Sequence, residues 1–73
     1  MKAYKLEDAV RSVAAEKEMK LFGSHEALIR EITQEIQSGE LDSDGVIDKL
    51  KTHKDFRMRF DFGDFEEIRN AIR

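Results

Sequence analysis

The acidic run Asp42-Ser43-Asp44-Gly45 is the stretch whose residue types and spacing come nearest to a known ligand site. Oxygen-bearing side chains leading to a glycine are typical of the EF-hand calcium loop, which has that glycine at position 6 and a bidentate carboxylate at position 12. With Gly45 at position 6, position 12 is Lys51, a cation that cannot ligate calcium. The same residues suit a helix start, with Asp42 as the N-cap and Asp44 in the first turn. We therefore predict a helix N-terminus here and no calcium site.

The two histidines, His25 and His53, are the other side chains that could do chemistry. Neither lies near a serine or threonine in a recognisable nucleophile motif, and the His-x3-His and His-x2-Glu spacings of helical metal sites are absent. The chain has no cysteine, and its four glycines are dispersed rather than gathered in a phosphate-binding loop. We expect both histidines to be partly buried structural residues. The sequence predicts a protein that is not an enzyme, with no metal and no cofactor.

Residues 49–59 form a basic segment with interleaved apolar side chains. Its five cations are Lys49, Lys51, Lys54, Arg57 and Arg59. Cations next to aromatic rings can pair with phosphates and stack on bases, so nucleic-acid binding through these five residues is one interpretation. Acidic runs flank the segment on both sides, which favours charge pairing within the protein or between protein chains. The net charge of −3 also argues against non-specific nucleic-acid binding by the whole domain.

Between residues 56 and 62 the apolar positions alternate with charged ones. Phe56, Met58, Phe60 and Phe62 are each separated by a single charged residue. Alternation is typical of a β-strand, in which successive side chains point to opposite faces. The sequence therefore predicts a short phenylalanine-rich strand at 56–62.

A single strand needs a partner, and three partners are open. Residues 2–6 could pair with it, or the same strand of a second subunit could do so across a two-fold axis. The third option is a return strand at 65–72 after a turn at Gly63-Asp64. Against that hairpin, Asp64 could cap a terminal helix, which we favour because Phe65, Ile68 and Ile72 would share one helical face.

The remainder of the chain has helical periodicity. Apolar residues recur at helical spacing over about residues 5–21, 25–38 and 43–54, and Gly23 and Gly39 suit the left-handed position that ends a helix. Ser24 would cap the second helix. The predicted fold is a mostly α single domain, residues 1–73, of three to four helices with one strand at 56–62. The alternative is an α+β fold with a C-terminal β-hairpin.

These patterns favour a small intracellular interaction or regulatory module that binds a protein partner or itself as a homodimer. A chain of 73 residues has little core, and association is a common route to stability for such chains. The predicted interaction residues are Phe56, Met58, Phe60, Phe62, Phe65, Arg57 and Arg59. The alternative is that the phenylalanines form the core, as aromatic clusters in small domains usually do, which leaves the interaction surface undefined. Nucleic-acid binding through the basic segment is the alternative. The absence of cysteine, of an export signal and of any long apolar run predicts a cytoplasmic protein without a membrane span.

Overall fold

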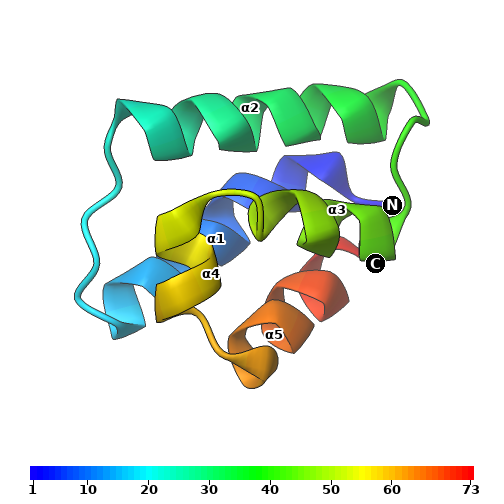
Figure 1. The fold of residues 1–73 in the computed structure, drawn as a ribbon. Helices are drawn as coiled ribbons and strands as arrows, with labels where there is room; N and C mark the ends of the chain where they lie inside the picture. The colour runs from blue at the N-terminus through cyan, green and yellow to red at the C-terminus, as the bar shows by residue number, and fades with distance from the viewer.

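The computed structural model describes residues 1–73 and is entirely helical, with five α-helices, one short 3-10 helix and no strand. The elements are η1 (Ala3–Lys5), α1 (Leu6–Glu16), α2 (Gly23–Gln37), α3 (Ser43–Leu50), α4 (Lys54–Arg59) and α5 (Phe62–Ile72). Figure 1 shows α2 along one side of the molecule and α5 at the opposite side, with α1, α3 and α4 between them. None of these helices has the length and apolar character needed to span a membrane.

One apolar core joins all five helices, with 17 buried hydrophobic residues in a single cluster. The predicted stripes of the first three helices enter it as expected. Val10 and Val13 come from α1, Ile32 from α2, and Val46 and Leu50 from α3, and all five are fully buried. The helical spacing of these residues in the sequence therefore identified the buried face of each helix correctly.

The predicted strand at 56–62 is wrong, and the alternative C-terminal hairpin is absent as well. Residues 54–59 form α4, and α5 begins at Phe62. Phe56 in α4 and Phe60, which follows the helix as its C-cap, lie four residues apart and are both buried in the core, whereas Met58 and Phe62 are exposed. The alternating pattern thus arises from two consecutive short helices, which bury only part of the apolar set.

Two side-chain caps explain why helices form here. The His53 ring accepts the N–H of Asp55 through Nδ1 at 3.2 Å, at the start of α4. At the start of α5, Asp61 accepts the N–H of Asp64 at 2.9 Å, and the Asp64 carboxylate accepts the N–H of Asp61 at 3.0 Å. This is a reciprocal capping box. The predicted terminal helix is present, but its N-cap is Asp61 rather than Asp64, so the helix includes Phe62 and the expected turn residue Gly63.

The connection between α1 and α2 also differs from the prediction. Helix α1 ends at Glu16 instead of continuing to residue 21, and the left-handed residue after it is Glu18, with a φ of 54°. Gly23 is the first residue of α2 and not the end of α1. The guanidinium of Arg59 donates to the carbonyl of Lys17 at 3.0 Å, which satisfies a backbone acceptor near the end of α1. Helix α4 therefore stabilises an early end of α1.

The start of α3 agrees with the prediction. Gly39 ends the preceding segment with a φ of 80°, and the Asp42 carboxylate accepts the N–H of Gly45 at 2.7 Å as the N-cap. The helix ends at Leu50 rather than at residue 54. The acidic run therefore caps a helix, as its spacing indicated.

Candidate functional site

Two histidines that are far apart in the sequence meet where α2 and α4 begin. Their rings stack with centroids 4.4 Å apart, and the edge of His25 packs on the Phe56 ring at 5.2 Å. His25 is only 2% exposed, and His53 is half-buried. This packing places four polar side chains at one point, Ser24, His25, His53 and Asp55, which we call the histidine cluster.

Hydrogen bonds in the histidine cluster cross between the two helices. His25 accepts the N–H of Phe22 through Nδ1 at 2.9 Å, and its Nε2 lies 2.8 Å from the Asp55 carboxylate. His53 accepts the N–H of Asp55 through Nδ1, and its Nε2 lies 3.1 Å from the Ser24 hydroxyl. Each histidine therefore caps its own helix with one nitrogen and bonds the other helix with the second. The Ser24 hydroxyl, predicted to cap α2, makes this link to His53.

The histidine cluster does not have the geometry of a Ser-His-Asp catalytic triad. In a triad one histidine takes the serine proton with one nitrogen while its other N–H is held by the carboxylate. Here the Asp55 carboxylate bonds His25, whereas Ser24 bonds His53. Because Nδ1 of His53 accepts a backbone N–H, the ring proton of the neutral form is on Nε2. That nitrogen therefore donates to Ser24 and cannot act as its general base.

The same cluster brings three metal-ligating groups together, with ligand atoms of His25, His53 and Asp55 all within 4.8 Å of one another. Both Nε2 atoms carry the ring proton, because both Nδ1 atoms accept backbone N–H groups. The lone pairs of imidazole lie in the ring plane, so two stacked rings cannot both aim at one ion at the ~2.0–2.1 Å of a zinc–nitrogen bond. The arrangement favours a structural role over metal binding.

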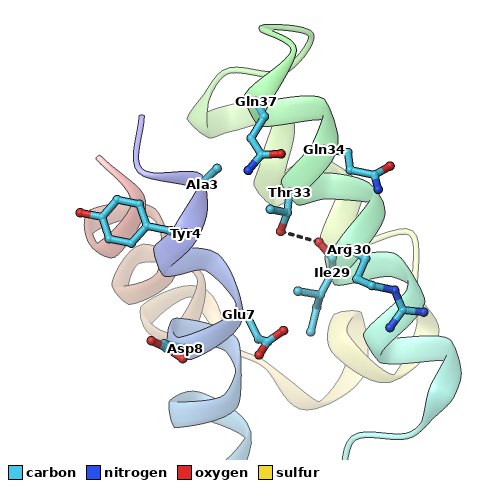
Figure 2. Close-up of a pocket in the computed structure, with 9 residues that line it drawn as sticks. All are labelled: Ala3, Tyr4, Glu7, Asp8, Ile29, Arg30, Thr33, Gln34 and Gln37. Carbon is cyan, nitrogen blue, oxygen red and sulfur yellow. Dashed lines mark hydrogen bonds between the residues drawn. The ribbon is translucent and has the colours of Figure 1, made fainter.

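A groove of about 390 Å³ runs between α2 and the segment formed by η1 and α1 (Figure 2). Tyr4 and Asp8 point away from α2, and Gln34 points away from α1. The Thr33 hydroxyl donates to the Ile29 carbonyl of its own helix at 2.8 Å. A ligand site needs polar groups that converge on one point, whereas three of the side chains of this groove point away from it and the Thr33 hydroxyl is already bonded.

The seven predicted interaction residues divide between the core and the surface. Phe56, Phe60 and Phe65 are buried and belong to the core cluster, so their assignment to an interaction surface is overturned by their burial. The other four are exposed: Met58 is 69% exposed, Phe62 is 79% exposed, and Arg57 and Arg59 are also exposed. We call these four residues, Arg57, Met58, Arg59 and Phe62, the α4–α5 surface.

The α4–α5 surface borders the connection between α1 and α2. Arg59 bonds the Lys17 carbonyl, and the ammonium of Lys17 lies 3.5 Å from the Asp61 carboxylate, next to Phe62 in the chain. Phe22, at the other end of this connection, is 64% exposed. Figure 1 shows the α1–α2 connection and α4 at the same end of the molecule. Exposed apolar side chains thus lie near both ends of the α1–α2 connection, Phe62 near its start and Phe22 at its end.

Comparison with protein-family models, with curated proteins and with solved structures gave no match.

The five cations of the basic segment do not form one continuous surface. The Lys49 ammonium bonds the Glu35 carboxylate and lies 3.7 Å from that of Glu31. The hydrogen bond that Lys49 donates to Glu35 and the charge of Glu31 raise the pKa of Lys49 despite the opposing desolvation. The Lys51 ammonium lies 5.1 Å from the centroid of the Phe65 ring. Lys51 and the three cations of α4 are exposed, and none of the four is paired with a carboxylate.

A second set of charged side chains, Lys17 with Asp61 and Asp64, links the end of α1 to the start of α5. The Lys17 ammonium lies 3.0 Å from the Asp64 carboxylate and 3.5 Å from that of Asp61. The hydrogen bond that Lys17 donates to the Asp64 carboxylate, with the nearby Asp61 charge, raises the pKa of Lys17. The backbone N–H of Asp64 and the positive charge of Lys17 lower the pKa of Asp61. These charges stabilise the fold beside the α4–α5 surface.

The histidine cluster could not be found from linear spacing, because the rest of α2 and all of α3 lie between its two halves in the sequence. One signal was available. Both His25 and His53 lie at the starts of helices, where side-chain acceptors satisfy free backbone N–H groups.

Proposed function

We propose that this chain is a small non-catalytic protein-interaction module of the cytoplasm that binds its partner through the α4–α5 surface. The observation that carries the proposal is the exposure of Met58 and Phe62, 69% and 79%, on two consecutive helices. Fully burying side chains of this size contributes about 1.5–3 kcal/mol each. A partner that covers them would therefore gain a substantial part of its binding free energy from two residues.

The composition of the α4–α5 surface supports this role. Arginine, methionine and aromatic residues are enriched in protein interfaces, and arginine is frequent among residues that dominate binding energy. Arg57 and Arg59 flank Met58 directly in the chain, and Phe62 begins the next helix. The exposed residues of this part of the chain are therefore of the types found in protein interfaces.

The non-catalytic part of the proposal is supported by the bonds of the histidine cluster. Its imidazole and carboxylate groups are engaged in helix capping and helix-to-helix links. His25, the more buried histidine, has partners for both ring nitrogens. A general base must instead be free to reach a substrate proton.

The test compares binding by wild type with binding by the double variant Met58→Ser/Phe62→Ser. Tyr4→Ser is the matched control, because Tyr4 is an aromatic residue that is 71% exposed on η1. We expect proteins captured by wild type and Tyr4→Ser to be lost with the double variant, and the purified partner to show the same loss in calorimetry. Sedimentation equilibrium on the three proteins tests the predicted homodimer in parallel. Unchanged capture and unchanged mass for the double variant would reject the proposal.

A further inference from the structure

The acidic side chains next to the α4–α5 surface have bonding partners inside the molecule, whereas two of the nearby cations do not. The Asp55 carboxylate is bonded to His25, and the Asp61 carboxylate lies 3.5 Å from the Lys17 ammonium. Lys54 and Arg57, by contrast, take part in no ion pair. The segment from Lys54 to Asp61 therefore carries three cations against two carboxylates, both of them bonded to other parts of the molecule, on a chain whose net charge is −3.

Arg59 adds to this positive charge. Its guanidinium donates to the Lys17 carbonyl, a neutral acceptor, so the hydrogen bond fixes the side chain without cancelling its charge. A guanidinium that is already held in place loses less side-chain entropy when it binds a carboxylate. Arg59 is therefore preorganised to meet an anionic partner beside Met58 and Phe62.

On these grounds we infer that the partner of the α4–α5 surface is a short acidic segment of another protein that also carries bulky apolar side chains. This inference rests on the proposed function and names the chemistry of the partner. Helix α4 has six residues and is about 9 Å long at 1.5 Å per residue, so the segment covering it needs only about two helical turns or an equivalent extended length.

A second copy of this chain fits the surface less well. Pairing across a two-fold axis places the same patch of each subunit against itself, which would bring Arg57 and Arg59 close to their own copies. Like charges facing each other across an interface oppose association. A head-to-tail contact with an acidic face of another copy would form a ring only with a suitable rotation between copies, and an open chain of copies otherwise.

Nucleic acid is also disfavoured by the placement of the cations. Lys49 is engaged with Glu35, which leaves Lys51, over the Phe65 ring, and the three cations of α4. Backbone binding depends on the number of phosphates neutralised, and four cations are few compared with the 6–10 contacts of strongly salt-dependent binders.

The experiment is a titration of ¹⁵N-labelled protein with three synthetic probes, followed by amide chemical shifts at low and moderate salt. The first probe is a 12-residue peptide of glutamate with leucine and phenylalanine at helical spacing. The second has lysine in place of every glutamate, and the third is a 12-nucleotide oligo(dT). We expect saturable shifts with the acidic peptide alone, centred on residues 55–63. No saturable shift with that peptide, or equal shifts with the lysine peptide, would overturn the inference, and tighter binding of oligo(dT) would replace it with nucleic-acid recognition.

Variants separate this inference from the proposed function. Arg57→Glu reverses a charge of the surface, and Lys5→Glu is the matched control on an exposed cation of η1. We expect Arg57→Glu to weaken the acidic peptide at least about tenfold and Lys5→Glu by less than about twofold, because only the former changes the charge at the contact. If Met58→Ser/Phe62→Ser abolishes binding of the captured partner while Arg57→Glu does not weaken it, the proposed interaction module stands and the inference of an acidic partner is wrong. If neither variant changes binding, both proposals fail.

Discussion

His25 shows how one residue can connect two helices through its two ring nitrogens. Its Nδ1 accepts the backbone N–H of Phe22 at the start of α2, and its Nε2 bonds Asp55 in the first turn of α4. The ring is 2% exposed and contacts the Phe56 ring. Buried polar groups stabilise a fold only when their hydrogen bonds are made. The contribution of His25 to stability therefore depends on both the Phe22 N–H and the Asp55 carboxylate.

Replacing His25 by phenylalanine should destabilise the fold even though an aromatic ring is kept. The variant retains a ring beside Phe56 but removes the acceptor for the Phe22 N–H and the donor to Asp55. We expect a loss of about 1–3 kcal/mol in the free energy of unfolding, the cost of leaving a buried partner unsatisfied. Urea unfolding followed by circular dichroism measures it. Ser24→Ala is the control, because its bond to His53 is exposed and should be worth under about 0.5 kcal/mol. Equal stability of the phenylalanine variant and wild type would contradict this role.

Phe60 and Phe62 provide a second comparison at single-residue scale, because they are close in sequence but opposite in burial. Phe60 is 4% exposed and Phe62 is 79% exposed. Phe60→Ala should cost about 3–5 kcal/mol, since it leaves a cavity in the core. Phe62→Ala should change stability by no more than about 0.5 kcal/mol. Thermal unfolding of both variants measures the difference, and similar losses would mean that Phe62 is part of the core.

At the scale of elements, the helices are short and depend on their caps and on packing. Helix α3 has eight residues and α4 has six, fewer than the ~12–15 that an isolated helix needs to be even marginally stable in water. Each begins at a side-chain cap, Asp42 for α3 and His53 for α4. The caps therefore set where these helices start, and the core keeps them folded.

Removing the cap of α3 tests this dependence. Asp42→Ala eliminates the acceptor for the Gly45 N–H, and we expect it to lower the free energy of unfolding by about 1 kcal/mol. Asp48→Ala is the matched control, because it removes the same charge from an exposed position within the same helix. Chemical unfolding of the two variants gives the comparison. An equal effect of both substitutions would show that charge, and not capping, is responsible.

Elements differ in how far their sequence predicted them. Helices α1, α2 and α3 bury three or more residues at helical spacing, so their existence was clear from the sequence. Helix α4 buries only Phe56 within its bounds, and one buried residue defines no period. Its cap is a histidine, which is not among the preferred N-cap residues, so the start signal was also missing. The two short helices in succession consequently resembled a strand.

The candidate surface was predictable only in part, for the same reason. Four of the predicted interaction residues, including Met58 and Phe62, are exposed, and three phenylalanines are core. A strand pattern placed all the apolar residues on one face, whereas the helical break after Arg59 separates them. Burial could therefore be assigned only after the local structure was known.

For the whole molecule, stability depends on joining the two ends of the chain. The N–H of Lys2 donates to the carbonyl of Ile72 at 2.6 Å, and Lys17 bonds Asp64 of α5. Helices α1 and α5 thus lie together although they are the first and last α-helices of the chain. Contacts between distant segments close a large loop, whose entropic cost only the complete fold offsets.

The charged group that joins α1 and α5 should make the stability of the whole fold depend on pH. The pKa of Asp61 is lowered from its ordinary value of 3.8 by the Asp64 N–H and by Lys17, so Asp61 stabilises the fold above that value. This contribution is lost as the pH falls through the lower, folded-state pKa. The raised pKa of Lys17 affects stability at high pH instead: the contribution of Lys17 is present below pH 10.5 and is lost as the pH rises through the folded-state pKa.

We expect Asp61→Asn, which keeps a good N-cap, to be less stable than wild type at pH 7, and the difference in stability between them to shrink below about pH 4. Urea midpoints at pH 7, 4 and 2.5 measure this difference, with Asp48→Asn as the control for an exposed aspartate. A gap between Asp61→Asn and wild type that stays constant over this range would show that the charge of Asp61 does not contribute.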